Sequence, residues 1–355
     1  MRTRVGLSLA VLTTVLLAGC TVAGEAAPQP SPAAPESSPA PSMPASPTPT
    51  AESRVEPVRL FDGECDRMLA PATLDAFLGD GWQDYDQWLT TQYAGSPDRV
   101  DPAPEGTLGG MECRWKAPED SASGLFDLRV LALPADAVPA DFAEKFATAA
   151  CDWQYDALIC RLLRVEDGVA ILAATLASES EADTHDDALS QAIDAVAASA
   201  RRGVAAAAPV TRSDRWWDGP ACEAIGERIA DLTEGTFVAG YWEGVESPEA
   251  GFFRTAGVSQ ECPWFSESET LPAGEPHRIF SVTTYPGGHW MWADLVEGAS
   301  PVDVSGAVDA ATFSEREDEA GSIYVTDGVN VLHVNGADLG FNVDVAERVL
   351  DVANS

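Results

Sequence analysis

Hydrophobic residues recur along the chain with the spacing of a helix in some segments and with the alternation of a strand in others. The same order of helix-like and strand-like segments occurs twice. Residues Cys222, Ile225, Ile229 and Leu232 fall on one face of a helix, in a stretch that ends near Gly235. A similar stretch runs from Cys65 to Gly79. The pattern therefore predicts two helices that each begin at a cysteine and place it next to the core.

Strand-like alternation follows each of these helices. The sequences Glu112-Cys113-Arg114-Trp115 and Glu261-Cys262-Pro263-Trp264 put Cys and Trp on the same side of a strand. Apolar runs come next, and then an Asp-Gly pair between two alternating segments, which favours a hairpin. The runs, hairpins and closing helices are expected at residues 125–133, 165–172 and 186–201, and again at 279–285, 325–332 and 343–352.

This repeated order predicts an α+β fold. We expect two tandem related domains, each an antiparallel sheet with helices packed on one face and stapled by disulfides. A stretch of small residues marks the boundary. The expected parts are a first domain at 58–202, a linker at 203–213 and a second domain at 214–355.

The repeat also selects one disulfide pattern among the 15 that six cysteines allow. It pairs Cys65 with Cys113 and Cys222 with Cys262, which leaves Cys151 and Cys160 as a local staple on a loop of the first domain. A redox dithiol is the alternative, but the chain has no Cys-x-x-Cys.

The N-terminus has the pattern of an export signal. Arg2 and Arg4 precede an apolar run that is too short to span a bilayer, and Leu17-Ala18-Gly19-Cys20 follows. This ending resembles the lipobox of bacterial lipoproteins. The resemblance implies that residues 1–19 are removed and that Cys20 carries a diacylglycerol; an ordinary secreted protein is the alternative.

Residues 20–57 are expected to comprise the lipidated cysteine and a disordered spacer rich in Pro, Ala and Ser, because this segment has few large apolar side chains. Together, the lipobox, the spacer and the Cys-x-Trp strands resemble actinobacterial lipoprotein domains of unknown function. That resemblance implies a lipid-anchored protein on the extracytoplasmic face of the cell membrane, and it supplies no catalytic residues.

The net charge limits the classes of molecule that this protein is expected to bind. The formal charge is −36, which disfavours nucleic acid and anionic lipid headgroups as partners. Solubility explains this charge most simply, with attraction to cations or basic partners as the alternative.

Catalytic signatures are missing from the sequence. It contains no Gly-x-Ser-x-Gly elbow, phosphate-binding loop or His-Glu-x-x-His. We therefore expect no catalytic residue, no metal site and no cofactor. The four histidines lack metal-ligand spacing; they are His185, His277, His289 and His333. The two acidic clusters lack the ligand series of a calcium loop; they are Asp80/Asp84/Asp86 and Glu315/Glu317/Asp318/Glu319.

The ten tryptophans are the least ordinary feature. Most of them can fill the cores of small domains, but some lie in loop-like sequence, namely Trp82, Trp88, Trp216, Trp217, Trp242, Trp290 and Trp292. In the segment from Tyr285 to Trp292, we expect Tyr285, His289, Trp290 and Trp292 to form a surface for a ligand or partner.

These observations favour a non-enzymatic binding or accessory protein of the cell envelope. Its partner would be an envelope protein, a glycan or a small apolar ligand, besides the bilayer that holds the N-terminal diacylglycerol. Two alternatives stay open: an envelope hydrolase with scattered carboxylates, and a purely structural envelope protein.

Overall fold

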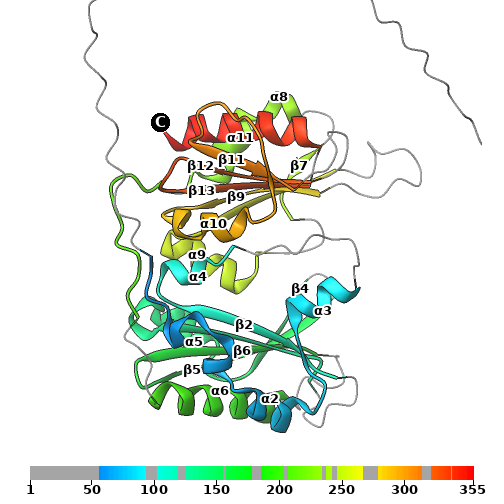
Figure 1. Cartoon of the computed structure of the whole chain (residues 1–355), viewed down its shortest axis with the longest axis vertical. Coiled ribbons are helices and arrows are strands. Elements are labelled where there is room, and N and C mark those ends of the chain that lie inside the picture. The colour runs from blue at the N-terminus through cyan, green and yellow to red at the C-terminus, as the bar shows by residue number, and fades with distance from the viewer. Residues whose placement is uncertain are drawn as a thin grey trace, which may run out of the picture. The chain divides into compact units, whose positions relative to one another are not determined.

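The computed structural model describes two antiparallel sheets, which confirms the α+β fold (Figure 1). The described residues are 56–92, 102–118, 125–154, 157–177, 185–202, 207–233, 237–241, 246–266, 279–313, 321–336 and 338–355. Cys20, Gly235, Trp242, His277 and the cluster at 315–319 lie outside them.

The two sheets have the same strand order. The first sheet runs β1(Gln83–Asp84), β2(Met111–Lys116), β3(Asp127–Pro134), β6(Val169–Ala177), β5(Ala157–Glu166) and β4(Ala150–Gln154). The second runs β7(Val238–Ala239), β8(Gln260–Phe265), β9(Ile279–Tyr285), β13(Val331–Asn335), β12(Ser322–Thr326), β11(Asp309–Thr312) and β10(Ser300–Pro301). Six strands correspond one to one, so the repeat seen in the sequence is also a repeat in topology. Residues 56–202 are called the first half below, and residues 213–355 the second half.

Helices cover the outer face of each sheet, as the hydrophobic periods predict. In the first half these are α1(Cys65–Met68), α2(Pro71–Leu78) and α6(His185–Arg201); in the second they are α7(Cys222–Arg228), α8(Ala230–Thr233) and α11(Leu339–Ala353). Both cysteine helices are broken where single helices were expected, the second at Ile229 between α7 and α8 and the first between α1 and α2. Pro71 lacks an N–H and keeps Ala70 extended, at φ −62° and ψ 147°.

Shorter elements occupy the inner side, where the two sheets face each other (Figure 1). They are α4(Pro104–Thr107), α5(Ala140–Lys145), α9(Pro248–Ala256), α10(Trp292–Leu295) and the 3-10 turn η4(Gly288–Met291). The remaining elements are α3(Tyr85–Gln92), η1(Leu60–Gly63) and η2(Ala135–Ala137). An apolar cluster joins the halves here, because Phe252 and Phe253 of α9 pack with Leu131 and Leu172 of the first sheet.

All three predicted disulfides are present: Cys65–Cys113, Cys151–Cys160 and Cys222–Cys262. In the repeated strands, Cys and Trp are buried on the same face, at 2% exposure for both Cys113 and Trp115. The expected loop position of the Cys151–Cys160 staple was wrong. These two cysteines are direct partners on β4 and β5, so the bridge ties an edge strand to its neighbour.

The two Asp-Gly hairpins differ in their turns. In the first half, Asp167 and Gly168 both have positive φ, at 50° and 82°, and form a two-residue turn. In the second half the strands pair only up to Thr326 and Val331, which leaves a four-residue loop. The Asp-Gly signal thus predicted both hairpins, but only one has the two-residue turn.

The predicted linker makes backbone contacts with the first half at Ala208 and Val210. Ala208 and Val58 exchange two hydrogen bonds of 2.9 Å, and Val210 N–H donates to the carbonyl of Thr107 at 2.9 Å. Residues 207–210 are therefore held by the fold.

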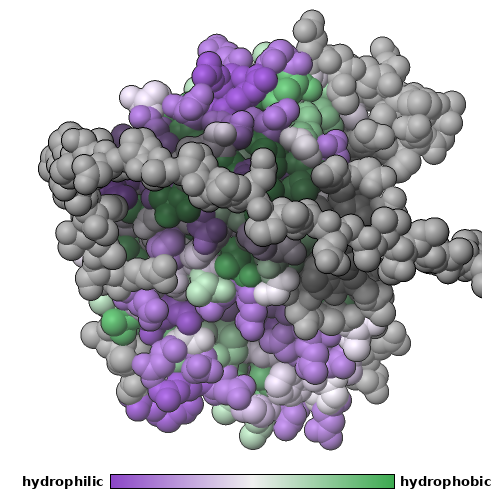
Figure 2. Space-filling model, turned by 45° about the horizontal axis from the view of Figure 1, so that its top comes forward, coloured by the Kyte–Doolittle hydropathy of each residue, from purple (hydrophilic) through white to green (hydrophobic). Residues whose placement is uncertain are grey.

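Hydrophilic residues dominate the visible surface in Figure 2, in keeping with the net charge of −36. None of the helices in the described ranges is both long and apolar enough to cross a membrane.

Candidate functional site at the inner face of the first sheet

The aromatic segment predicted as a surface is largely buried. Tyr285 and Trp292 are 7% and 6% exposed and pack with Met291, Leu295 and Tyr324. The expectation that Tyr285 and Trp292 belong to a ligand or partner surface is therefore corrected. The segment turns back over the inner face of its own sheet, and most of its apolar area becomes core.

Trp290 contacts the first half instead of solvent. Its Nε1 donates to Thr107 Oγ1 at 3.0 Å, and its ring lies where a Cβ on Gly106 would be only 2.5 Å away. His289 makes a contact within its own half, with Nδ1 2.9 Å from Thr326 Oγ1. Only a glycine at position 106 allows the indole so close, so this segment forms part of an interface within the chain.

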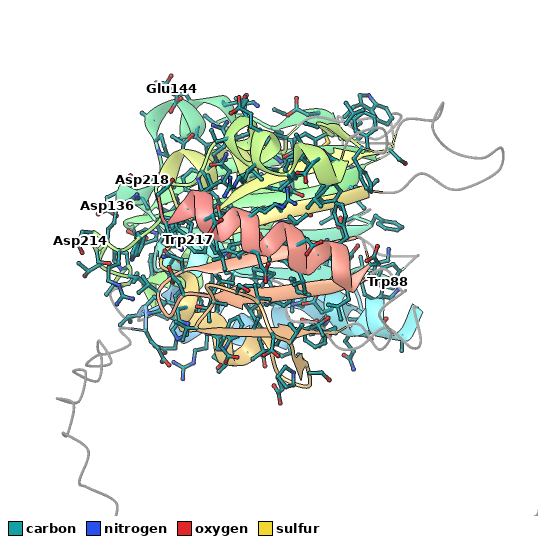
Figure 3. The ribbon with its side chains drawn as sticks, turned by 90° about the horizontal axis from the view of Figure 1, so that it is seen from above. Trp88, Asp136, Glu144, Asp214, Trp217 and Asp218 are labelled. Atoms are coloured by element: carbon teal, nitrogen blue, oxygen red, sulfur yellow. A yellow bond between two sulfur atoms is a disulfide. The ribbon has the colours of Figure 1, made fainter. Side chains whose placement is uncertain are left out.

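Asn330 fixes the turn that carries this segment. It is fully buried, and its Oδ1 accepts hydrogen bonds from Trp217 N–H at 3.1 Å and Gly287 N–H at 3.0 Å. Its Nδ2 donates to the carbonyl of Arg215 and to Asp327 Oδ2. Trp217 lies near the C-terminal end of α11 in Figure 3, where its Nε1 donates to Asn354 Oδ1 at 3.3 Å. One side chain thus ties the start of the second half to two of its turns.

Three arginines form a row on the inner face of the first sheet. Arg114 is paired with Arg129, and Ala174 lies between Arg129 and Arg161 in the register. Residues directly opposite each other in an antiparallel sheet share a face. Basic groups are therefore concentrated here, although acids outnumber bases by 57 to 21 in the chain.

Two of these arginines are neutralised by glutamates. Arg161 is 0% exposed and its Nε donates to Glu249 Oε1 at 2.7 Å, across the two halves. Arg129 pairs with Glu112 at 2.6 Å and lies 3.9 Å from Glu249. Burial raises the pKa of Glu249, but Arg129 and Arg161 outweigh it and hold that pKa below the usual range.

Glu105 lies in the same interface as Glu249, but its pKa is shifted in the opposite direction. It is 8% exposed, and burial, followed by repulsion from Glu112, raises its pKa to about 8. Attraction to Arg129 and Arg59 only partly offsets this rise. Glu105 is therefore mostly protonated at neutral pH.

Arg114, at the other end of the row, has no ion-pair partner among the described residues. Its guanidinium lies 3.9 Å from the centre of the Tyr85 ring, and its buried Nε has no hydrogen-bond partner in the described part of the chain. Lys116 follows two residues later, on the same side of the strand, with Nζ 5.5 Å from the Trp88 ring centre. We call Tyr85, Trp88, Arg114 and Lys116 the cationic corner.

Helix α3 supplies the aromatic half of this corner. Asp84 Oδ1 accepts from the N–H groups of Asp86 and Gln87, and so satisfies donors at the helix start. Tyr85 and Trp88 are three residues apart and lie on one side of the helix, with ring centres 5.3 Å apart. Figure 3 shows Trp88 at the edge of the ribbon, on the opposite side from Asp136, Asp214 and Asp218.

A separate cavity of about 330 Å³ opens on the outer side of the first half, between α2 and α6. Most of the residues that line it are apolar, and a few are polar; among them are Leu69, Phe77, Ala192, Ala195, Thr73 and Gln191. Its size would accommodate a small apolar molecule. The charged residue that lines this cavity, Asp194, is paired with Arg164 at 3.1 Å.

The histidines and acids that lie within the described ranges do not form a metal centre. No group of three or more potential metal ligands occurs within the described ranges. His185 is buried at 2% exposure, and His333 stacks on Tyr324 with ring centres 4.3 Å apart. Among the acids of the first cluster, Asp84 serves as a helix cap.

Two pairs of acids bear on hydrolytic chemistry, which needs one carboxyl group with a raised pKa beside a second carboxylate. Burial and a neighbouring glutamate raise the pKa of Glu105, beside Glu112, and of Glu261, beside Glu246. In each pair the second acid is bound to an arginine, Glu112 to Arg129 at 2.6 Å and Glu246 to Arg254 at 2.8 Å. This arrangement suits structural ion pairs.

Sequence reasoning missed the arginine row and the cationic corner. Arg114 was visible as the variable residue inside Glu-Cys-x-Trp, and Trp88 was noted only as a loop tryptophan. The usable signal was the alternation within residues 111–116, which places Arg114 and Lys116 on the face opposite Cys113.

Comparisons with known proteins do not assign the chain to a family. No protein-family model matches the chain, and no curated protein matches it. One solved structure, the di-domain ARO/CYC StfQ from the steffimycin biosynthetic pathway, aligns with 11% identity and a TM-score of 0.13, over 69% of this chain and 80% of that one.

Proposed function

We propose that this protein is a membrane-anchored extracellular lipoprotein whose folded part binds a component of the cell envelope. The lipid on Cys20 would hold the protein at the outer face of the membrane. The sequence between Cys20 and the first described residue would act as the spacer. Binding, rather than catalysis, is the role of the folded part.

The distribution of the seven cysteines is the observation that carries this proposal. Six of them form three disulfides, a chemistry typical of exported proteins. The cysteine left over is Cys20, and it directly follows Leu17-Ala18-Gly19. An odd cysteine in an oxidising compartment calls for an explanation, and lipid attachment at a lipobox provides one.

The inner face supports binding over catalysis. Its ionisable groups are mostly tied into ion pairs between strands or between the two halves, such as Arg161–Glu249. The cationic corner, in contrast, combines half-buried aromatic rings with a guanidinium that has no carboxylate partner among the described residues. Such a combination is common in recognition surfaces.

Metabolic labelling with an alkyne fatty acid tests the anchor. Wild-type protein should incorporate the label and fractionate with membranes, whereas Cys20→Ser should incorporate none. A variant with both Cys151→Ser and Cys160→Ser is the matched control and should keep the label. Label on Cys20→Ser, or unlabelled wild type in the medium, would overturn the proposal.

A further inference from the structure

The cationic corner is an exception in an acidic protein. The chain has 57 acids and 21 bases, and its only lysines are Lys116 and Lys145. Long-range electrostatics should therefore keep anions away from most of the surface. An anion can bind only where bases are gathered locally and nearby acids are otherwise engaged.

Both bases of the corner are held in place by aromatic rings. The Arg114 guanidinium stacks on Tyr85 at 3.9 Å, and Lys116 Nζ lies 2.8 Å from the ring centre of Phe126 and donates to the Phe126 carbonyl at 2.9 Å. Stacking leaves the edge of a guanidinium available for paired hydrogen bonds to a carboxylate. This arrangement lowers the entropy cost of binding because the side chains are already ordered.

Two neighbouring acids, Asp84 and Asp127, accept hydrogen bonds from other groups. Asp84 Oδ1 caps α3 through two backbone N–H groups. Asp127 is 7% exposed, and its Oδ1 accepts from Leu176 N–H at 2.8 Å and from Thr175 Oγ1 at 3.2 Å. Burial raises the pKa of Asp127, although backbone and side-chain hydrogen bonds and the charges of Arg114 and Lys116 lower it in part.

We infer that the cationic corner binds a sugar that carries a carboxylate, as part of an acidic glycan of the cell envelope. Arg114 and Lys116 would hold the carboxylate, and the half-buried indole of Trp88 would pack against the C–H face of the sugar ring. This inference rests on the proposed function, since it takes the ligand from the compartment that the anchor implies.

A sugar acid fits better than other anionic ligands. The corner offers two cations beside one indole, whereas the backbone of a nucleic acid needs a longer basic surface than a chain of charge −36 provides. An apolar ligand would leave the charge of the Arg114 guanidinium without a carboxylate partner among the described residues. A carboxylate supplies an acceptor, and a ring supplies the stacking surface.

The test compares two tetrasaccharides that share N-acetylglucosamine. One alternates N-acetylglucosamine with glucuronic acid, and the other is the neutral chitotetraose. The full chain, purified in a neutral detergent, is titrated with each by calorimetry and by tryptophan fluorescence. The acidic sugar should bind at least about tenfold more tightly, which is the contribution of one charge-assisted hydrogen bond, and added salt should weaken its binding.

Two variants and two matched controls locate the site. Arg114→Gln and Trp88→Leu should each weaken binding of the acidic sugar by about tenfold or more. Arg228→Gln removes an exposed arginine that pairs with Asp351, and Trp153→Leu removes a tryptophan that is 54% exposed. Both controls should bind like wild type. Thermal unfolding of all four variants shows whether a loss of binding reflects a loss of fold.

Equal affinity for the two tetrasaccharides, no binding at millimolar concentration, or wild-type binding by both corner variants would overturn the inference. The fatty-acid labelling experiment is independent of this result. Labelled protein without sugar binding would reject the sugar site and leave the anchor, and sugar binding without label would reject the anchor and leave the site. Lys116→Gln serves as a third variant if Arg114→Gln does not fold.

Discussion

The two halves place the same dipeptide at the same point of the fold, with opposite electrostatic results. Pro104-Glu105 begins α4 and Pro248-Glu249 begins α9, and each helix precedes a Cys-x-Trp strand. Both glutamates are buried, at 8% and 2% exposure. The pKa of Glu105 is raised to about 8, whereas that of Glu249 is lowered.

The reason lies in the sheets that supply their partners. Arg129 and Arg161 reach Glu249 from the first sheet. In the second sheet, the row that corresponds to the three arginines contains Pro263, Ser281, Asn335 and Ser322, without a base. Glu105 has no arginine within ion-pair distance among the described residues and is repelled by Glu112. The outer faces of the two halves repeat the same fold, while their inner faces have diverged to fit one another.

Removing Glu249 should have the largest effect on stability. Glu249→Gln leaves Arg161 buried and uncompensated, which should lower the free energy of unfolding by about 3 to 5 kcal/mol. Chemical unfolding with the disulfides intact measures this. Asp351→Asn, which breaks an exposed pair with Arg228, is the control and should cost less than about 1 kcal/mol. Similar losses for the two variants would show that the buried pair is not an anchor between the halves.

Removing a disulfide should cost more stability for Cys222–Cys262, the kind of bridge that both halves have, than for Cys151–Cys160, which only the first half has. Changing both Cys222 and Cys262 to Ala opens a loop of 40 residues, and should cost about 4 kcal/mol. The same change at Cys151 and Cys160 opens a loop of 9 residues and should cost about 2.5 kcal/mol. Urea unfolding of the two double variants gives the comparison. A larger loss for the short loop would mean that β4 depends on its bridge for more than loop entropy.

The pH dependence of stability should report on Glu105. Its pKa is about 8 in the folded protein and 4.5 as a free side chain, so the folded state binds the proton more tightly. Wild type should therefore lose stability as pH rises from 4.5 to about 8. Glu105→Gln abolishes this loss and should stabilise the protein by roughly 3 kcal/mol at pH 7 and by nothing below pH 4.

Unfolding midpoints across this pH range test the prediction, with Glu144→Gln, an exposed residue of α5, as the control. A Glu105→Gln curve parallel to that of wild type would contradict a proton held on Glu105 at neutral pH.

The smallest effect is expected at the turns. Asn330→Ala leaves the buried N–H groups of Trp217 and Gly287 without an acceptor, and should cost roughly 2 kcal/mol. In the sequence repeat the first half has Ala170 at this position, so Ala170→Gly is a control that removes no such acceptor. Hydrogen exchange at Trp217 and Gly287 should quicken only in Asn330→Ala. Unchanged exchange would show that the turn does not depend on Asn330.

The sequence predicted the structure well where a residue type or a pattern has a single common structural role, as cysteine pairing and strand alternation do. Alternation put Cys113 and Trp115 on the core side, and the repeat selected the three disulfides that the structure contains. It was less informative for the segment from Tyr285 to Trp292. Aromatic residues serve both exposed surfaces and cores, and local sequence does not show that Trp290 packs on Gly106, which is 184 residues away.

By itself, then, the sequence determined the α+β class, the repeated order of elements and the cysteine pairing, because these follow from short-range period and spacing. The tertiary structure alone decided which charges meet. Arg161 and Glu249 are 88 residues apart, and Arg114 and Tyr85 lie on different elements. Burial and pairing of charge depend on the packing of distant segments, so the fate of Glu105, Glu249 and the cationic corner could be read only from the folded chain.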